Sequence, residues 1–306
     1  NVVVPDKPIK QFGADAVRYW AAAARLGLDA TYDEGQMKIG RRLAIKLLNA
    51  SKFALAIGRE DENHHVGETA DAVWNPVDVT EPLDRAVMAK LALVIRQATD
   101  ALNAYEHSKA LEVIESFFWQ FCDDYIELVK NRAYGTADAH GKVPSDAAVK
   151  SARTTLGLGL DAFARLLAPY LPFATEEVWS WMHTGEGSVH RAAWPKADIY
   201  AAAATGASPE TLAWAGKAVE QLRKIKSEAK VSMKTPILSV TLAAVKDGID
   251  AIKSALDDVA QAGRVIGKFD LAEKHAEEAT AEGEGDDTVV IDASELGEPP
   301  AKKAKK

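Results

Sequence analysis

Hydrophobic residues recur every three or four positions along most of the first 200 residues, the spacing that places them on one face of an α-helix. The pattern is strongest over residues 36–57. It returns in later segments, some of which begin at a cap or a proline or end near glycine or proline. These later segments cover residues 80–105, 107–133, 145–167 and 174–182. Long helices joined by loops predict an antiparallel helical bundle.

Beyond the bundle the pattern changes from helical to mixed, which predicts a small α/β unit. Residues 188–191 are extended in character and are expected to add a short strand. In chain order we then expect a linker, a helix, a strand, a helix and a strand, over residues 197–208, 210–228, 237–245, 248–259 and 288–292. The predicted fold class is therefore mainly α: an antiparallel helical bundle followed by a small α/β subdomain.

The composition is that of an ordinary globular protein, with 47% hydrophobic and 27% charged residues. No stretch of about eighteen apolar residues is present in the sequence, so we expect no membrane span. The single cysteine, Cys122, rules out an intrachain disulfide and a cysteine-based zinc cluster, and it fits a reducing cytoplasm. The chain begins without an initiator methionine, which suggests a fragment of a longer protein.

The charge of the chain is unevenly distributed, and this distribution bears on the choice of partner. The formal net charge is −8, but residues 270–298 hold eleven acids and one base, so the rest of the chain sums to +2. Residues 35–59 carry six bases and no acid. The phosphate backbone of a nucleic acid binds to a local row of basic residues of this kind, and the overall charge of the protein matters less.

The segment at 36–57 sorts its residues into two faces when it is drawn as a helix. One half is apolar and holds Ile39, Leu43, Leu47, Leu48, Ala54 and Leu55. Ile45 is the exception, because it falls on the other half. The other half carries cations, a carboxamide and an aromatic ring: Lys38, Arg42, Lys46, Asn49 and Phe53, with Arg41 and Lys52 beside them. Such a face suits single-stranded RNA, because cations neutralise phosphates, Asn pairs with base edges and the ring stacks on bases. The alternative is a solvated basic face with Phe53 tucked sideways into the core.

Four motifs, in the right order, resemble those of the valyl-tRNA synthetases, a family of class I aminoacyl-tRNA synthetases. Gly13 to Trp20 resembles the GADALR stretch that follows the KMSKS loop. Residues 1–5 resemble the GNVxxP continuation of that loop, so the fragment is expected to begin just after it. Residues 33–53 resemble the first helix of the anticodon domain, with its K-L-x-N-A-x-x-F pattern. Residues 117–128 are similar to the family's FFWxxFCDxYLE helix, and residues 169–181 to its P-x-x-P-F-x-x-E-x-W helix.

The resemblance implies an enzyme, a ligase that attaches valine to tRNA-Val with the use of ATP. The catalytic HIGH and KMSKS motifs would lie upstream of Asn1, so this fragment should hold no catalytic residue, bind no ATP itself and be inactive alone. In the family the first bundle helix approaches the anticodon, which makes Lys46 and Phe53 the best candidates for base contact. The expected partners are tRNA-Val and the catalytic domain of the same enzyme, in a cytoplasmic monomer without membrane contact.

The resemblance and the pattern together predict four parts. Residues 1–34 would follow the catalytic domain as a connector near the tRNA stem, and residues 35–200 would form the anticodon-binding bundle. Residues 201–297 would form the α/β subdomain with an acidic spacer, and residues 298–306 a disordered basic tail.

We expect no metal site and no active site in this chain. Residues 230–234 look like a scrambled KMSKS motif and are interpreted as a turn. Residues 263–269 mimic a phosphate loop but lack the Ser or Thr that such a loop needs. His64 and His65 are adjacent in a polar loop, and His183 and His190 have no ligand at metal-binding spacing.

Two alternatives to a synthetase fragment stay open. A free-standing helical RNA-binding or interaction module would use the same basic face without a catalytic partner in its own chain. A helical scaffold that binds no RNA would show no salt-dependent affinity for tRNA. Isoleucyl and leucyl relatives are less favoured, because residues 33–53 carry the valyl pattern.

Overall fold

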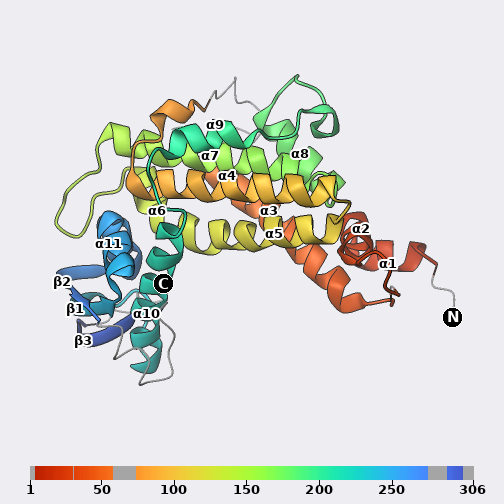
Figure 1. Ribbon diagram of the computed structural model, residues 1–306. Helices are drawn as coiled ribbons and strands as arrows, with labels where there is room; N and C mark the ends of the chain where they lie inside the picture. The colour runs from red at the N-terminus through yellow and green to blue at the C-terminus, as the bar shows by residue number, and fades with distance from the viewer. Residues whose placement is uncertain (1–3, 30, 58–73, 275–287, 299–306) are drawn as a thin grey trace, which may run out of the picture. The chain divides into compact units, whose positions relative to one another are not determined.

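The structure, a computed structural model, describes residues 4–29, 31–57, 74–274 and 288–298 (Figure 1). The described part is mainly helical and contains one three-stranded sheet, which confirms the predicted fold class. The chain forms two compact units. The first unit lies within residues 1–79, 88–122 and 153–205, and the second within residues 80–87, 123–152 and 206–306. The predicted four-part division stays a prediction.

The helices fall close to the predicted segments. Up to residue 204 the helical elements are α1 (Asp6–Phe12), α2 (Ala14–Ala23), α3 (Glu34–Ala56), η1 (Pro76–Asp78), α4 (Pro82–Asn103), α5 (His107–Gln120), η2 (Phe121–Tyr125), α6 (Ile126–Tyr134), α7 (Asp146–Leu167), α8 (Pro172–Met182), η3 (Val189–Arg191) and α9 (Ala197–Ala204). The five predicted bundle segments are confirmed, and their ends are shifted by no more than two residues. The segment predicted at 107–133 contains a π-helical turn, η2, between α5 and α6.

α3 begins at a side-chain cap and is held by a close crossing with α2. The Asp33 side chain accepts hydrogen bonds from the backbone N–H groups of Gly35 (2.7 Å) and Gln36 (3.3 Å). These are donors that the first turn of a helix otherwise leaves without a partner. Further along, a Cβ at Gly40 would lie 2.6 Å from the side chain of Tyr19 on α2. Glycine at this position therefore allows the two helices to approach each other.

α2 is fastened to the turn between α7 and α8. The buried Asp15 carboxylate accepts hydrogen bonds from the N–H groups of Phe173 (3.0 Å) and Ala174 (2.8 Å), in the first turn of α8. Arg18 Nε donates to the carbonyl oxygen of Pro169 at 2.7 Å. Because the first N–H groups of a helix have no acceptor within it, Asp15 acts as an N-terminal cap supplied by a distant helix.

Aromatic rings form part of the core of the first unit. Phe163 on α7 is contacted by Phe117, Phe118 and Phe121, with ring centroids 5.7, 5.1 and 5.3 Å apart. All four rings are buried, and so is the free thiol of Cys122. The aromatic motif at 117–128 therefore contributes packing to this unit.

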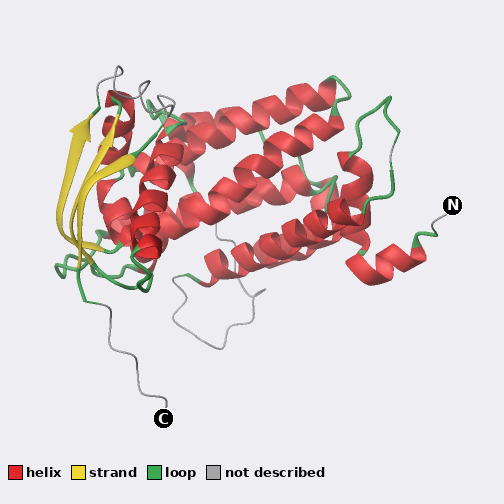
Figure 2. Cartoon of the chain, turned by 90° about the horizontal axis from the view of Figure 1, so that it is seen from below, coloured by secondary structure: helices red, strands yellow, loops and turns green. Residues whose placement is uncertain are grey.

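The second unit contains the small α/β subdomain that the sequence predicts (Figure 2). After residue 205 its elements are α10 (Thr211–Glu228), β1 (Ile237–Ala244), α11 (Lys246–Ser254), α12 (Leu256–Gly263), β2 (Val265–Glu273) and β3 (Val290–Leu296). The strand order is β2-β1-β3, with β1 parallel to β2 and antiparallel to β3. α10, α11 and α12 pack against the sheet, whose buried residues include Val240, Leu242 and Ala244 of β1.

A buried ionic cluster ties together helical segments of the second unit. The Arg132 guanidinium on α6 donates to both oxygens of Asp84 (2.8 Å each) and to both oxygens of Asp258 on α12 (3.0 and 2.9 Å). Asp84 also accepts hydrogen bonds from the hydroxyls of Tyr125 (2.8 Å) and Ser151 (2.6 Å). All five side chains are buried.

The charges in this cluster are unequally compensated. Burial disfavours the charged guanidinium, but the two carboxylates outweigh that effect and raise the pKa of Arg132. Burial raises the pKa of Asp258 to about 6, against the lowering influence of Arg132. One cation cannot neutralise two carboxylates, and Asp84 receives the two hydroxyl hydrogen bonds. The pKa of Asp258 is therefore raised even though its carboxylate is paired with Arg132.

Three segments differ from the prediction. Residues 188–191, expected as a strand, contain the 3₁₀ turn η3, because the Ser188 side chain accepts a hydrogen bond from the His190 N–H. The expected linker at 197–208 contains α9, whose alanines favour helix. The helix expected at 248–259 is divided at Ala255 into α11 and α12.

One strand is absent from the prediction. β2 covers most of the residues interpreted as a failed phosphate loop, and it pairs with β1. A Cβ at Gly267 would lie 1.9 Å from the carbonyl oxygen of Leu238, so this glycine serves the approach of two strands. At the start of the acidic segment 270–298, residues 270–273 belong to β2, whereas the strand expected at 288–292 is found as β3.

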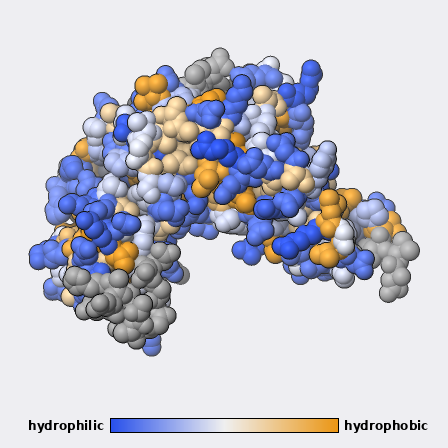
Figure 3. Space-filling view, viewed as in Figure 1, coloured by the Kyte–Doolittle hydropathy of each residue, from blue (hydrophilic) through white to orange (hydrophobic). Residues whose placement is uncertain are grey.

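Several predicted features lie outside the described residues. These are the loop with His64 and His65, the acidic residues between positions 275 and 287, and the basic tail after Glu298. The face shown in Figure 3 is mostly hydrophilic with scattered apolar areas, as expected where amphipathic helices turn their polar sides to water. In the described part of the chain, no helix is both long and apolar enough to cross a membrane.

Candidate nucleic-acid interface

The five residues predicted to contact RNA all lie on α3, and they differ in exposure. Lys38, Arg42 and Asn49 are exposed, whereas Lys46 and Phe53 are partly buried. Neither the phenyl ring nor any of the cations is sealed inside the protein. Their contact with RNA stays a prediction.

The opposite side of α3 packs into the first unit, against α2 and α8. The predicted core residues are buried or partly buried: Ile39, Leu43, Leu47, Leu48, Ala54 and Leu55. Met37 and Gly40 are buried with them. The division of this helix into an apolar side and a basic side is therefore confirmed.

The exposed side of α3 contains more residues than the five predicted. Arg41, Ile45 and Lys52 are exposed as well. The side chain of Ile45 is 46% exposed, which explains why it breaks the apolar sorting: it belongs to the solvent side. Arg41 donates to the backbone carbonyl of Gln11 at 2.9 Å and so also holds α1.

Two tryptophans from other helices lie beside the cations of α3. The guanidinium carbon of Arg42 is 5.9 Å, and Lys46 Nζ 6.0 Å, from the ring centroid of Trp119 on α5. Lys52 Nζ is 5.5 Å from the ring centroid of Trp181 on α8. All three distances are within the range of about 6 Å over which a ring face attracts a cation.

Each of these tryptophans is fixed by a glutamate one helical turn earlier. Trp119 Nε1–H donates to Glu115, and Trp181 Nε1–H donates to Glu177, both at 3.1 Å. Glu115 also accepts a hydrogen bond from the Tyr19 hydroxyl at 2.6 Å. Burial, and then the Glu115 carboxylate, raise the pKa of Tyr19, so its hydroxyl remains a donor at neutral pH.

Both tryptophans are absent from the predicted site, although the sequence contains a signal for them. Glutamate and tryptophan stand four positions apart at 115–119 and again at 177–181, which makes them neighbours on a helix surface. Trp119 is partly buried and Trp181 is buried. Their apolar surroundings in the sequence indicate packing, but the sequence does not reveal that their rings meet α3.

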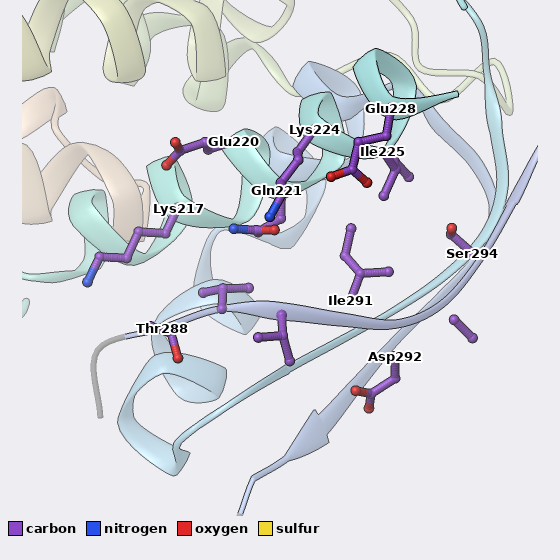
Figure 4. Close-up of a pocket in the computed structure, with 13 residues that line it drawn as sticks. Lys217, Glu220, Gln221, Lys224, Ile225, Glu228, Thr288, Ile291, Asp292 and Ser294 are labelled. Atoms are coloured by element: carbon purple, nitrogen blue, oxygen red, sulfur yellow. The ribbon is translucent and has the colours of Figure 1, made fainter. Parts of the chain in front are cut away.

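A groove in the second unit offers less to a nucleic acid. It has a volume of about 610 Å³ and lies between α10 and β3 (Figure 4). Ile225 and Ile291 point into it, whereas Lys224 and Glu228 stand along its α10 side. Because its lining carries both signs of charge, the groove lacks the positive surface that a phosphate backbone requires.

His183 in the first unit belongs to a polar cluster. Its Nε2 lies 2.8 Å from Asp161, its Nδ1 lies 3.1 Å from Glu186, and its ring stacks on Trp179 with centroids 3.8 Å apart. These contacts orient the imidazole between α7 and the end of α8. Among the residues that the structure describes, no group of three or more His, Cys, Asp or Glu is placed to hold a metal ion.

The segment that looks like a scrambled KMSKS motif is a turn, as interpreted. α10 ends at Glu228, and Lys230 adopts a left-handed φ of 53°. The buried Lys226 donates from Nζ to the carbonyl oxygens of Met233 (3.3 Å) and Gly263 (2.7 Å). These bonds fasten the turn to the end of α12.

A comparison with protein families finds one whose model matches this chain. A family model described as the anticodon-binding domain of tRNA ligase matches residues 84–242, more than half of the chain. The match includes helices of the bundle and the start of the α/β subdomain.

Several curated valine–tRNA ligases are similar to the chain. The protein from Bifidobacterium longum strain NCC 2705 is 81% identical over 305 residues, which cover all of this chain and 34% of that protein. The protein from Thermobifida fusca strain YX is 48% identical over 267 residues, 87% of this chain and 28% of its own length. The protein from Cutibacterium acnes is 43% identical over 305 residues and 31% of its length. The chain spans about a third of the length of the curated relatives it matches.

One solved structure, LeuRS of Agrobacterium radiobacter K84 in a ternary complex with tRNA and LeuAMS, aligns with 89% of this chain and 30% of its own. The identity is 15% and the TM-score 0.46, a likeness too low to bear on function. The resemblance to valyl-tRNA synthetases, by contrast, is confirmed by the identities with valine–tRNA ligases. The chain belongs to the family of anticodon-binding domains of tRNA ligases.

Proposed function

We propose that this chain is the tRNA-binding part of a valine–tRNA ligase and that the exposed side of α3 contacts the anticodon loop of tRNA-Val. One observation carries the proposal: α3 gathers cations, a carboxamide and a partly exposed phenyl ring on the side opposite its apolar face, and residues 35–57 contain no carboxylate. The 81% identity with a valine–tRNA ligase over the whole chain supports the choice of amino acid.

In this proposal the longer protein attaches valine to tRNA-Val with ATP. Valine and ATP bind to a catalytic domain outside this chain, and the present chain supplies the hold on tRNA. The enzyme acts as a monomer in the cytoplasm. The two-thirds of the relatives' length that this chain does not span leave room for such a catalytic domain.

The residues of the basic side have distinct roles in the proposal. Lys38 and Arg42 are exposed and neutralise phosphates of the loop. Asn49 offers a donor and an acceptor to the edge of an unpaired base. Phe53 stacks on a base through the exposed part of its ring, and Lys46 lies one turn before Asn49 on the Trp119 side.

The proposal is tested by filter binding of the chain to tRNA-Val and to tRNA-Ile across a salt series. Phe53→Ala should weaken the binding of tRNA-Val by about 1–3 kcal/mol, the contribution of one stacked base. Lys46→Ala should weaken it less. Phe173→Ala and Lys253→Ala are matched controls, because both side chains are exposed and neither belongs to α3, so their loss should leave affinity unchanged.

Three outcomes contradict the proposal. Unchanged affinity in both α3 variants, with intact helical circular dichroism, would remove the basic side of α3 from the interface. Equal affinity for tRNA-Val and tRNA-Ile would remove the assignment to valine. Valine-dependent exchange of pyrophosphate into ATP by the pure chain would place an active site inside it.

A further inference from the structure

We propose that Trp119 and Trp181 are positioning residues, which hold the cationic heads of α3 on its nucleic-acid side. The inference rests on the proposed function and adds to it two side chains from α5 and α8. Neither tryptophan is assigned a contact with RNA. Each acts through the Lys or Arg beside its ring.

Trp119 lies beside two cations at once. Arg42 and Lys46 are one helical turn apart on α3, and their charged groups lie 5.9 and 6.0 Å from the same ring centroid. Two neighbouring cations repel each other, and long side chains lose rotamer entropy when they are held in place. Attraction to a shared ring offsets both costs and fixes the direction of the two heads.

The ring of Trp119 is itself held by a series of contacts that begins and ends on α3. Gly40 on α3 receives the side chain of Tyr19. The Tyr19 hydroxyl donates to Glu115, and Glu115 accepts the indole N–H of Trp119, whose ring meets Arg42 and Lys46. The position of the two cations is therefore tied to the packing of α2 against both α3 and α5.

Trp181 repeats this arrangement for Lys52. Its indole N–H is bound by Glu177, which stands four residues earlier, as Glu115 does for Trp119. Lys52 Nζ lies 5.5 Å from the ring centroid. The same Glu-x-x-x-Trp unit therefore serves cations of α3 from two different helices.

A ring suits this task better than a carboxylate does. A carboxylate would neutralise the cation that it positions, and an incoming phosphate would have to displace it. The face of an indole attracts a cation through its quadrupole and carries no net charge. Arg42 and Lys52 are thus oriented while they remain exposed and positively charged.

The test is a double-mutant cycle on the binding of tRNA-Val by the chain. Trp119→Leu should weaken binding by about threefold to tenfold, and Trp119→Phe should stay within about twofold of the wild type, because a phenyl ring keeps a cation-attracting face. In a background of Arg42→Gln and Lys46→Gln, Trp119→Leu should add no further loss. Trp194→Leu is the matched control, because this partly buried indole binds Thr99 on α4.

An equal loss from Trp119→Leu in both backgrounds would overturn the inference, since the tryptophan would then touch RNA itself or serve the fold alone. If Trp119→Leu does not fold, Trp119→Met, whose longer side chain fills more of the indole volume, enters the same cycle. Failure of the wild-type chain to bind tRNA would instead remove the proposed function.

A second cycle, read as the melting temperature of the chain without RNA, keeps the inference testable in that case. Trp119→Leu should lower the melting temperature more in the wild-type background than in the background that lacks both cations, because the ring then has no cation to hold. Equal shifts in the two backgrounds would overturn the inference.

Discussion

Arg42 and Arg132 carry the same guanidinium group in opposite surroundings. Arg42 is exposed on α3, and its guanidinium carbon lies 5.9 Å from the ring centroid of Trp119. Arg132 is buried, and it donates hydrogen bonds of 2.8 to 3.0 Å to Asp84 and Asp258. The ring leaves the positive charge of Arg42 in place, whereas the two carboxylates more than cancel the charge of Arg132.

This difference separates two uses of arginine in one chain. Arg42 keeps its charge for a ligand outside the protein, and Arg132 uses its charge to hold elements of the fold together. Substitutions at the first arginine should change binding far more than stability, and substitutions at the second should change stability far more than binding. The following substitutions test whether effects on tRNA binding and effects on stability are separate in this way.

The largest effect is expected at Arg132. Arg132→Met should reduce the free energy of unfolding by about 3–5 kcal/mol, because it leaves two carboxylates buried without their cation. Urea denaturation followed by circular dichroism measures the change, with Arg42→Gln as the matched control. If the folded Arg132→Met chain lost tRNA affinity as strongly as it lost stability, the two uses would not be separate.

The buried cluster should make the stability of the chain depend on pH. Burial raises the pKa of Asp258 to about 6 in the folded chain, above the value of about 3.9 expected when it is unfolded. The folded chain therefore binds more protons between these values, so the contribution of Asp258 to stability is complete below pH 4 and is lost as pH rises through 6.

Asp258→Asn removes this dependence. Relative to the variant, the wild type should lose up to about 3 kcal/mol of unfolding free energy between pH 4 and pH 6. Asp257→Asn, at the exposed neighbour, should leave the wild-type pH profile intact. Parallel profiles for Asp258→Asn and the wild type would show that Asp258 does not titrate in that range.

At the basic side of α3, the effect is expected mainly on binding. Lys38→Gln combined with Arg42→Gln should lower tRNA affinity and reduce the slope of log K against log salt by about 0.7 for each single-strand phosphate that the variant no longer neutralises. The exposed pair Lys253→Gln with Arg191→Gln changes the net charge equally and should leave the slope unchanged. A slope that fell by the same amount in both double variants would point to net charge rather than to a local contact.

The smallest effect is expected at an ion pair on the surface of the second unit. Lys142 Nζ lies 3.0 Å from Asp257, and both side chains are largely exposed. Lys142→Ala should not change the urea midpoint measurably, because water screens exposed pairs. A clear shift of the urea midpoint would show that an exposed ion pair also stabilises the fold. Burial would then not explain the larger loss of stability expected at Arg132.

The sequence predicts the bundle helices well because their signal is local. The 3.6-residue spacing of apolar positions lies within each helix, and α3 is found within two residues of its predicted ends. β2 has no comparable signal, since it becomes a strand by pairing with β1 and depends on Gly267 for that approach. α9 is hidden because alanines give no contrast between a buried and an exposed face.

The same distinction holds for the candidate site. Lys38, Arg42, Lys46, Asn49 and Phe53 share one helix, so a wheel is enough to group them. Trp119 and Trp181 come from α5 and α8, and only tertiary packing brings their rings to α3. The Arg132 cluster is equally invisible in sequence, because its three charged members stand at positions 84, 132 and 258.

The cap that Asp15 provides for α8 has a consequence for synthesis on the ribosome. Asp15 is made long before Phe173 and Ala174, whose N–H groups it binds. A nascent chain that ends before α8 has neither this anchor for α2 nor the indole beside Lys52. The surface that we assign to tRNA is thus complete only after α8 has been synthesised, well after α3 itself.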